Sequence, residues 1–231
     1  MYSYNFKRVE EKYLLSKKQR DLLLRKIRSY IEKDEYYEST ICNIYFDTPD
    51  HKLIINSLEK PIYKDKVRLR SYNIPNLEDD VFLEIKCKYD GIVSKRRIKL
   101  KLQEFYQYLE NKTCPKNHQI MKELDYLFHF YQLQPSYFIA YDRKSYRGVY
   151  DDELRITIDS NLRSRREDLQ LELGDAGKRY FSEDHYIMEI KTLDAMPLWL
   201  VQCLSELKIF PISFSKYGSI YQKDEEVVYA N

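Results

Sequence analysis

Charged and apolar residues alternate in strand-like stretches along much of this chain. The clearest stretch is Lys66-Val67-Arg68-Leu69-Arg70. Five further stretches of the same kind begin at residues 8, 84, 95, 154 and 188. Because successive side chains of a strand point to opposite faces, each stretch predicts a strand with one ionic face and one apolar face.

The alternation, together with the turn signals between the runs, predicts where the strands lie. They cover residues 6–15, 42–47, 66–72, 81–88, 92–100, 137–149, 154–162, about 170–173 and 185–192. Tyr89-Asp90-Gly91 joins two alternating runs, and Asp-Gly in that position is a strong signal for a β-hairpin.

Helical spacing of apolar residues predicts about four helices. Ser16 is expected to be the N-cap of the first helix, with Gln19 placed to complete a capping box. Apolar positions then recur at helical spacing as far as Ile31. The other helices are expected over residues 102–110, 118–131 and about 197–208, the last with Pro197 in its first turn.

About eight strands, mostly joined as hairpins, and four helices predict an α+β fold with a mostly antiparallel sheet. A sheet with one ionic and one apolar face can bury its apolar side chains in two ways. Either helices cover the apolar face and the ionic face meets water, or the sheet closes into a barrel with a charged interior. The alternation by itself is compatible with both.

Composition narrows the class of protein. The 231 residues are 43% hydrophobic and 33% charged and contain only 5 Gly and 7 Pro, which predicts a single globular domain over residues 1–231. A net charge of +2 excludes a globally basic nucleic-acid binder. The chain shows no signal-peptide core and no long apolar run, and its four cysteines are scattered. We therefore expect a cytoplasmic protein with reduced thiols.

Basic residues dominate the ionic positions of the predicted strands. They are Lys12, Lys66, Arg68, Arg70, Lys86, Lys88, Lys95, Arg97, Arg143, Arg155, Lys191 and Lys216. Like charges on adjacent strands repel unless an anion screens them, and Arg and Lys are the usual ligands of phosphate oxygens. A solvated face with salt bridges is the alternative for any single strand, whereas the whole set predicts a polyanionic ligand.

Three glutamates, Glu10, Glu84 and Glu189, each precede a lysine by two residues on these faces. Carboxylates are hard oxygen ligands for Mg²⁺ or Mn²⁺, with phosphate able to complete the coordination shell. Cross-strand ion pairs are the alternative. No nucleophile motif, Walker-type glycine loop or zinc-protease motif occurs, so an enzyme of this kind would perform phosphoryl transfer by positioning and charge neutralisation.

The order of the ionic motifs resembles that of a known family. The matching segments are Phe6-Lys7-Arg8, Lys12-Tyr13, Tyr45-Phe46-Asp47, Arg68-Leu69-Arg70-Ser71-Tyr72, Phe82-Leu83-Glu84-Ile85-Lys86, Ser94-Lys95-Arg96-Arg97, Tyr141-x-Arg143, Arg155-Ile156-x-Ile158-Asp159, Glu189-Ile190-Lys191 and Phe214-Ser215-Lys216-Tyr217. Over residues 6–218 the chain resembles the VTC (vacuolar transporter chaperone) domain, the polyphosphate polymerase module of the triphosphate tunnel metalloenzyme superfamily.

This resemblance implies a closed, eight-stranded antiparallel barrel with helices packed outside and a basic lumen. It implies that ATP binds inside and donates its γ-phosphate to a growing inorganic polyphosphate chain, with Mn²⁺ or Mg²⁺ at Glu189. Together with the basic set it predicts catalytic and phosphate-binding cations. The catalytic group is Lys12, Arg68, Arg70, Lys86, Arg143 and Arg155, and the phosphate-binding group is Lys66, Lys95, Arg97, Lys191 and Lys216. Glu10 and Glu84 are further candidate metal ligands.

One departure keeps the reaction open. Glu10 is an acid where the eukaryotic polymerases have none, and it is similar to the E-x-E-x-K strand of the superfamily's triphosphatases. Polymerase, tripolyphosphate or nucleoside-triphosphate hydrolase, and non-catalytic polyphosphate-binding module are therefore all compatible with the sequence. ATP and polyphosphate are the expected partners, and nucleic acid is not. Attachment at the inner face of a membrane would need a membrane-protein partner.

Overall fold

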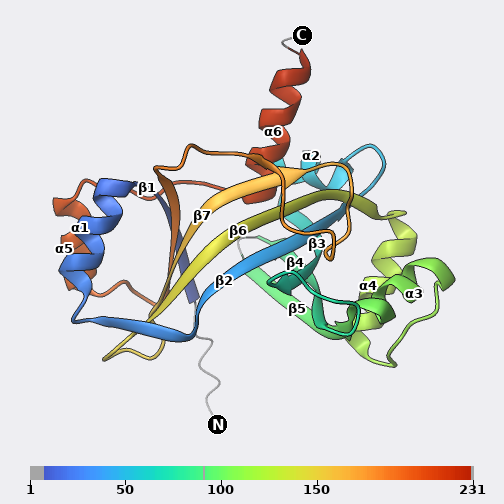
Figure 1. Ribbon diagram of the computed structural model, residues 1–231, viewed down its shortest axis with the longest axis horizontal. Coiled ribbons are helices and arrows are strands. Elements are labelled where there is room, and N and C mark those ends of the chain that lie inside the picture. Colours follow the sequence, from blue (N-terminus) through green and yellow to red (C-terminus); the bar gives the residue numbers. More distant parts are fainter. Residues whose placement is uncertain (1–7, 91, 230–231) are drawn as a thin grey trace. The chain divides into compact units, whose positions relative to one another are not determined.

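The computed structural model describes residues 8–90 and 92–229 (Figure 1). The chain divides into two compact units. Unit 1 draws on Met1–Ser39, Tyr141–Leu162 and Arg179–Phe214, and unit 2 on Thr40–Ala140, Arg163–Lys178 and Ser215–Asn231. The expected single domain over residues 1–231 stays a prediction.

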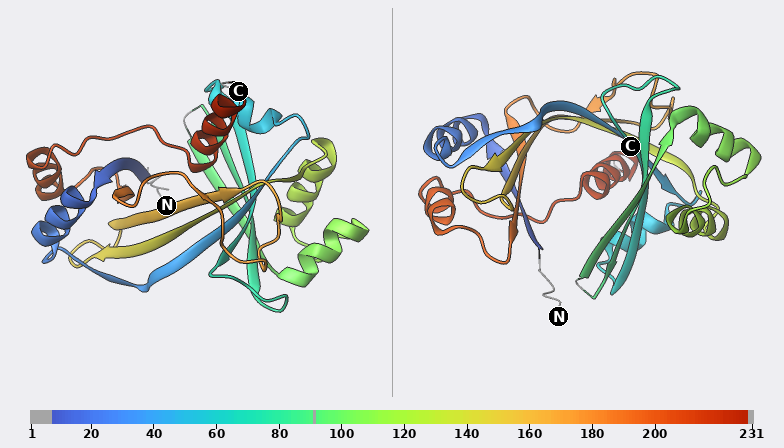
Figure 2. Two further views of the ribbon diagram at one scale, coloured as in Figure 1. Left: turned by 45° about the horizontal axis from the view of Figure 1, so that its top comes forward. Right: turned by 90° about the horizontal axis from the view of Figure 1, so that it is seen from below.

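Unit 1 is a layer of strands covered by two helices. Its elements are β1 (Arg8–Ser16), α1 (Lys17–Ile27), the first part of β2 (Ile31–Asp47), the later part of β6 (Gln134–Gly148), most of β7 (Arg155–Arg165), β9 (His185–Leu193) and α5 (Leu198–Glu206). Helices α1 and α5 lie side by side in both views of Figure 2. Leu23 of α1 and Leu200 of α5 pack with Leu15, Ile156 and Ile190 of the strands in one buried cluster. The apolar faces predicted for these strands are therefore the core of unit 1.

The first helix begins as its sequence predicts. Ser16 Oγ accepts a hydrogen bond from the backbone N–H of Gln19, and the Gln19 side chain accepts one from the backbone N–H of Ser16 at 3.1 Å. These two bonds satisfy N–H groups that have no partner within the helix, so α1 starts at Lys17.

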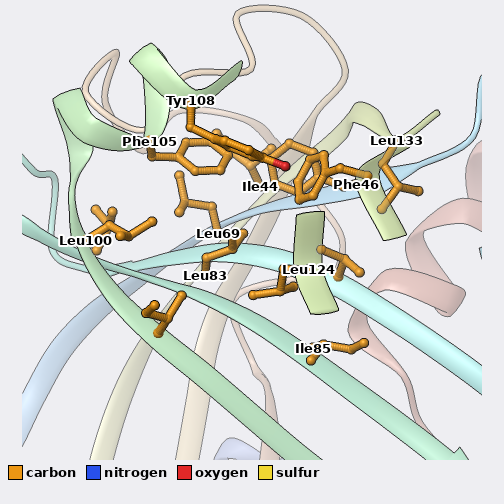
Figure 3. Close-up of a cluster of buried hydrophobic side chains, with 14 of the residues drawn as sticks. Ile44, Phe46, Leu69, Leu83, Ile85, Leu100, Phe105, Tyr108, Leu124 and Leu133 are labelled. Atoms are coloured by element: carbon orange, nitrogen blue, oxygen red, sulfur yellow. The ribbon is translucent and has the colours of Figure 1, made fainter. Parts of the chain in front are cut away.

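Unit 2 is built on a three-stranded meander. It contains α2 (Lys52–Leu58), β3 (Tyr63–Tyr72), β4 (Asp80–Tyr89), β5 (Ile92–Lys101), α3 (Leu102–Asn111), α4 (Gln119–Phe130) and α6 (Lys216–Tyr229). Figure 3 shows Leu69 and Leu83 of the sheet in one cluster with Phe105 of α3 and Leu124 of α4. Helices α3 and α4 thus cover the apolar face, which leaves the opposite face of β3, β4 and β5 ionic.

The strand order of the nine described strands is β1-β9-β7-β6-β2-β3-β4-β5, with the short strand β8 (Lys178–Arg179) on β7. The registered pairs of β1, β3, β4, β5 and β9 are antiparallel, which confirms a mostly antiparallel sheet with helices. The series of pairings begins at β1 and ends at β5. Closure of the sheet into a barrel is therefore not confirmed.

The hairpin expected at Tyr89-Asp90-Gly91 is confirmed by the pairing of Tyr89 with Ile92. Gly91 itself lies outside the described residues, as do residues 6 and 7 of the first predicted strand. Within the described ranges, no helix is long and apolar enough to cross a bilayer.

Strand β2 begins at Ile31, eleven residues before the predicted strand at 42. Ile31 therefore opens a strand and does not continue the first helix. The early part of β2 is rich in acidic residues, and after Ile31 its side chains are exposed or half-buried without strict alternation. Its acidic side chains form ion pairs with cations of β6. Glu32 lies 2.8 Å from Arg147, and Glu38 lies 2.9 Å from Lys144.

Helices α2 and α6 were not predicted, so α5 is not the last helix as expected. Both helices begin with hydrogen bonds to side chains that precede them. The Asp47 carboxylate accepts from the backbone N–H groups of Leu53 and Ile54, at 2.8 and 3.0 Å. Ser215 Oγ accepts from the N–H of Gly218 at 3.2 Å.

The strand predicted around residues 170–173 is wrong, because that segment is irregular. A side chain binds backbone carbonyl groups at the start of this segment and just beyond its end. The Arg165 guanidinium donates to the carbonyl oxygens of Gln170 at 2.9 Å and of Gly174 at 3.0 Å.

Candidate functional site

Unit 2 presents a row of cations on the side of its meander opposite to α3 and α4, called the basic face below. Its members are Lys66, Arg68 and Arg70 of β3, Lys86 of β4, and Lys95 and Arg97 of β5. Lys66 is opposite Lys86, and Lys86 is opposite Lys95, so three lysines form one row across adjacent strands. Glu84 is opposite Arg68 on one side and Arg97 on the other. The predicted cations of these strands do share one face.

Glu84 is the carboxylate of the basic face, and its oxygens are engaged by cations at short distances. The side chain is 2% exposed, and its Oε2 accepts from Arg68 Nε at 2.8 Å. Lys95 Nζ lies 2.7 Å from Oε1. Burial would raise the pKa of Glu84, but the charges of Arg68, Arg70 and Lys95 outweigh burial and lower that pKa to about 2. Glu84 is therefore ionised and holds two cations in place.

The pKa of Lys95 lies below that of an ordinary lysine. Burial lowers its pKa to about 8, although the attraction of Glu84 opposes the shift and the repulsion of Arg68 and Arg70 adds to it. An anion bound beside Lys95 would favour its charged form.

Further contacts fix the cations of the basic face. Arg70 is buried, and its Nε donates to Asn43 Oδ1 at 2.9 Å. Arg68 Nη1 donates to the Tyr45 hydroxyl at 3.1 Å. Lys66 Nζ donates at 2.8 Å to Ser215 Oγ, the residue before α6, and Lys216 is the first residue of that helix. Unit 2 thus brings the predicted cations of β3, β4 and β5 together and joins Lys66 to the segment that carries Lys216.

Unit 1 carries a second ionic face of different composition, called the mixed face below. Its members are Glu10 and Lys12 of β1, Arg143 of β6, Arg155 and Asp159 of β7, and Glu189 and Lys191 of β9. In the strand register, Lys191 stands between Glu10 and Arg155. Glu189 stands between Lys12 and Thr157. The predicted site residues of β1, β6, β7 and β9 therefore also meet in one place.

Glu189 lies at the centre of the mixed face, with a side chain that is 11% exposed. Its carboxylate is 3.9 Å from Lys12 Nζ, 3.9 Å from Arg143 Nη2 and 3.8 Å from Lys191 Nζ. Glu10 shares two of these neighbours, at 3.4 Å from Lys12 and 3.8 Å from Lys191. Two carboxylates thus face the same pair of ammonium groups.

Arg143 is a fixed cation of the mixed face. Its guanidinium donates two hydrogen bonds to Asp159, at 2.7 and 2.8 Å. Burial would lower the pKa of Arg143, but Tyr141, Asp159 and Glu189 raise it well above its ordinary value. Asp159 was not among the site residues predicted from the sequence. Its signal was the alternation Arg155-x-Thr157-x-Asp159, which places a carboxylate on the ionic face two residues beyond Thr157.

Two of the three carboxylates of the mixed face, Glu10 and Glu189, fit part of the coordination shell of Mg²⁺ or Mn²⁺. No described group of three or more His, Cys, Asp and Glu side chains is suited to hold a metal ion. Glu10 and Glu189 nevertheless supply two hard oxygen donors on neighbouring strands, and Mg²⁺ is commonly held by one or two carboxylates with substrate phosphates. Glu84 fits less well, because Arg68 and Lys95 already occupy its oxygens.

Comparisons with known proteins bear on the fold and on the family of this chain. No curated protein matches the chain by sequence. A crystal structure from Bacillus halodurans, described as a candidate adenylate cyclase, is 16% identical with a TM-score of 0.55, covering 90% of this chain and 93% of its own. A second from Vibrio parahaemolyticus, described in the same way, is 14% identical with a TM-score of 0.54, covering 93% of this chain and 97% of its own. Both show a shared fold.

The family assignment rests on sequence. The family model of the VTC domain matches residues 7–223, which include both ionic faces and every cation and carboxylate predicted for the site. This chain belongs to the VTC domain family.

Proposed function

We propose that this protein is a metal-dependent polyphosphate polymerase that transfers the γ-phosphate of ATP to a growing inorganic polyphosphate chain. The basic face carries this proposal. Lys66, Lys86 and Lys95 stand side by side across three strands, and the buried carboxylate beside them is already bound by cations. Such a surface is stabilised by an anion with several charges, and a linear polyphosphate provides them. Membership of the VTC domain family supports the same ligand.

The side chains have distinct parts in this proposal. The Glu84 carboxylate holds Arg68 so that the guanidinium donates to a phosphate in a fixed orientation. Lys66, Lys86 and Lys95 neutralise charge, and Lys216 and Arg97 extend this set. Arg143, held by Asp159, is a second preorganised cation for charge that develops on the transferred group. The reaction therefore needs no covalent side chain.

Glu189 and Glu10 would hold the Mg²⁺ or Mn²⁺ ion. When bound, the ion neutralises phosphate oxygens and orients the reacting groups. Lys12, Lys191 and Arg155 of the same face would bind phosphate oxygens beside it. Closure of the strands into an eight-stranded tunnel lined by the ionic faces is part of this proposal. So are a cytoplasmic location, and a membrane-protein partner for any attachment to a membrane.

Hydrolysis of tripolyphosphate or nucleoside triphosphates is the second candidate function. It is favoured by Glu10, whose carboxylate lies 3.4 Å from Lys12 and shares that lysine with Glu189. A second carboxylate beside the metal ligand could orient a water molecule, which would replace the phosphate chain as acceptor.

Product analysis separates these functions. The purified protein is incubated with ATP and either MnCl₂ or MgCl₂, and products are resolved on a polyacrylamide gel and by assay of free phosphate. We expect a ladder of long chains. Free phosphate without chains would assign hydrolysis, and tight polyphosphate binding without any product would leave a non-catalytic binding module.

A further inference from the structure

Within the described part of the chain, two hydrogen-bond donors on the ionic side of β7 have no acceptor. Thr157 Oγ1 and Arg155 Nη1 are buried atoms, and neither has a hydrogen-bond partner among the described residues. Arg155 Nε lies 3.9 Å from an Asp34 carboxylate oxygen, beyond hydrogen-bond distance. Buried donors are satisfied in the great majority of cases, because an unsatisfied one costs free energy. Two of them on one strand indicate that an acceptor binds here.

The two donors point to the same side of the sheet. Arg155 and Thr157 are two residues apart, and the intervening Ile156 is buried in the core on the opposite face. In the register of the strands, Thr157 is opposite Glu189, and Arg155 is opposite Lys191. An acceptor that satisfies both donors would therefore lie on the mixed face, next to the carboxylate proposed to hold the metal.

The charges around the donors indicate the chemistry of the acceptor. Lys12, Arg143 and Lys191 all lie within 4 Å of Glu189, the residue opposite Thr157. The Asp159 carboxylate is engaged by Arg143 through two short hydrogen bonds. An acceptor that joins Arg155 and Thr157 among these cations is best an oxygen with negative charge.

We infer that Thr157 is a phosphate-binding residue whose hydroxyl donates to a phosphate oxygen that Arg155 also binds. The inference rests on the proposed function, because it assigns a further contact to the same phosphate chain. Thr157 carries no charge and was outside the set of cations and glutamates that sequence reasoning singled out. A hydrogen bond from its hydroxyl depends on direction, whereas the attraction of the neighbouring cations depends mainly on distance. The hydroxyl therefore positions the phosphate beside Glu189.

Substitution of Thr157 tests this role. Thr157→Val keeps the shape of the side chain and removes the donor, whereas Thr157→Ser keeps the donor. We expect Thr157→Val to bind inorganic tripolyphosphate about tenfold more weakly, since a hydrogen bond to a charged group is lost. Thr157→Ser should bind within about twofold of the wild type. Isothermal titration calorimetry in the presence and absence of MgCl₂ measures both.

Thermal unfolding of the ligand-free protein is an independent test, because Thr157→Val should weaken binding without lowering the melting temperature. The melting temperature of Thr157→Val should equal or exceed that of the wild type, because the valine removes a buried hydroxyl that has no hydrogen-bond partner within residues 8–90 and 92–229. A purely structural threonine would give the reverse pattern, with a lower melting temperature and unchanged binding. Ser160→Ala is the matched control on β7, since Ser160 Oγ donates to the Asp142 carbonyl oxygen at 3.3 Å and should leave tripolyphosphate binding unchanged.

The outcomes separate this inference from the proposed function. If the wild type does not bind tripolyphosphate, the proposed function itself fails. If the wild type binds and Thr157→Val binds equally well, or if Thr157→Ser loses as much affinity as Thr157→Val, the role of Thr157 is overturned while the proposed function stands.

Discussion

The basic face of unit 2 and the mixed face of unit 1 grow from the same sequence pattern and differ in what surrounds their carboxylates. Both contain a Glu-x-Lys pair on an alternating strand, at Glu84 in one and at Glu10 and Glu189 in the other. Cationic nitrogens of Lys95 and Arg68 lie 2.7 and 2.8 Å from the Glu84 carboxylate oxygens. The contacts of Glu189 with Lys12, Arg143 and Lys191 are 3.8 to 3.9 Å.

This difference indicates that chemically identical glutamate side chains have different roles in the two faces. A carboxylate at hydrogen-bond distance from two cations is best suited to hold those cations in position. A carboxylate at longer distance from several cations, with a second carboxylate nearby, retains the capacity to bind a divalent ion. The spacing Glu-x-Lys therefore indicates an ionic face, and the role of its glutamate depends on partners from other strands.

The strongest test of the comparison is turnover in Glu189→Gln. We expect metal-dependent turnover of ATP to fall by about two to three orders of magnitude, because a group that stabilises transition-state charge is lost. Binding of ATP should remain detectable, since the cations of both faces are intact. Turnover at several Mn²⁺ concentrations, with calorimetric binding of ATP, checks both parts. Turnover equal to that of the wild type would refute a metal role for Glu189.

Glu84→Gln should instead act mainly on stability. The substitution leaves Arg68 and Lys95 without a buried counter-charge, and removal of one partner from such a pair costs about 3 kcal/mol. Urea denaturation measures this loss, and Glu189→Gln, with its longer contacts, is the matched comparison and should lose less. Equal losses in the two variants would remove the distinction between the faces.

Acid titration sharpens the same contrast. The pKa of Glu84 is lowered to about 2 from an ordinary value of 4.5, so its stabilising contribution is complete above pH 4.5 and is lost as the pH falls towards 2. In Glu84→Gln this part of the acid dependence should disappear. Denaturation midpoints of both proteins between pH 2 and pH 6 (roughly the span of a carboxyl titration) provide the measurement.

Because of Lys95, we expect ligand binding by the basic face to depend on pH in the alkaline range. Its pKa of about 8 means that the ligand-free protein loses this positive charge as the pH rises through 8. Affinity for tripolyphosphate should therefore fall by roughly fivefold between about pH 7 and pH 9, the contribution of one partly exposed charge. Lys95→Arg stays protonated and should show a smaller decrease. An identical decrease in both proteins would assign the effect to another group.

The sequence predicted the two faces better than it predicted their contacts. Alternation is a local property, so the ionic and apolar sides of β3, β4 and β5 could be assigned from their residues alone. The capping box at Ser16 and the hairpin at Tyr89 depend on a few adjacent residues and were predicted for the same reason.

Interactions between distant segments were beyond the sequence pattern. Arg143 is held by Asp159 of another strand, and the hydroxyl of Tyr217 donates to Asp47 at 2.8 Å across 170 residues. Helix α2 begins where Asp47 accepts two backbone N–H groups, a signal that no N-cap pattern contains. The irregular segment at residues 170–173 is stabilised by Arg165, whose reach the local residues do not indicate.

Adjacent arginines of β5 offer the finest test of which side of the meander binds polyphosphate. Arg97 lies on the basic face, 4.7 Å above the Phe82 ring, whereas Arg96 lies on the other side and pairs with Glu123 of α4 at 3.0 Å. We expect Arg97→Ala to weaken polyphosphate binding by roughly fivefold, because an exposed cation contributes up to ~1 kcal/mol. Arg96→Ala removes the same charge one residue away and should change affinity by less than about twofold. Since the two variants have equal net charge, an equal loss in both would mean that binding follows overall charge and not the arrangement of the basic face.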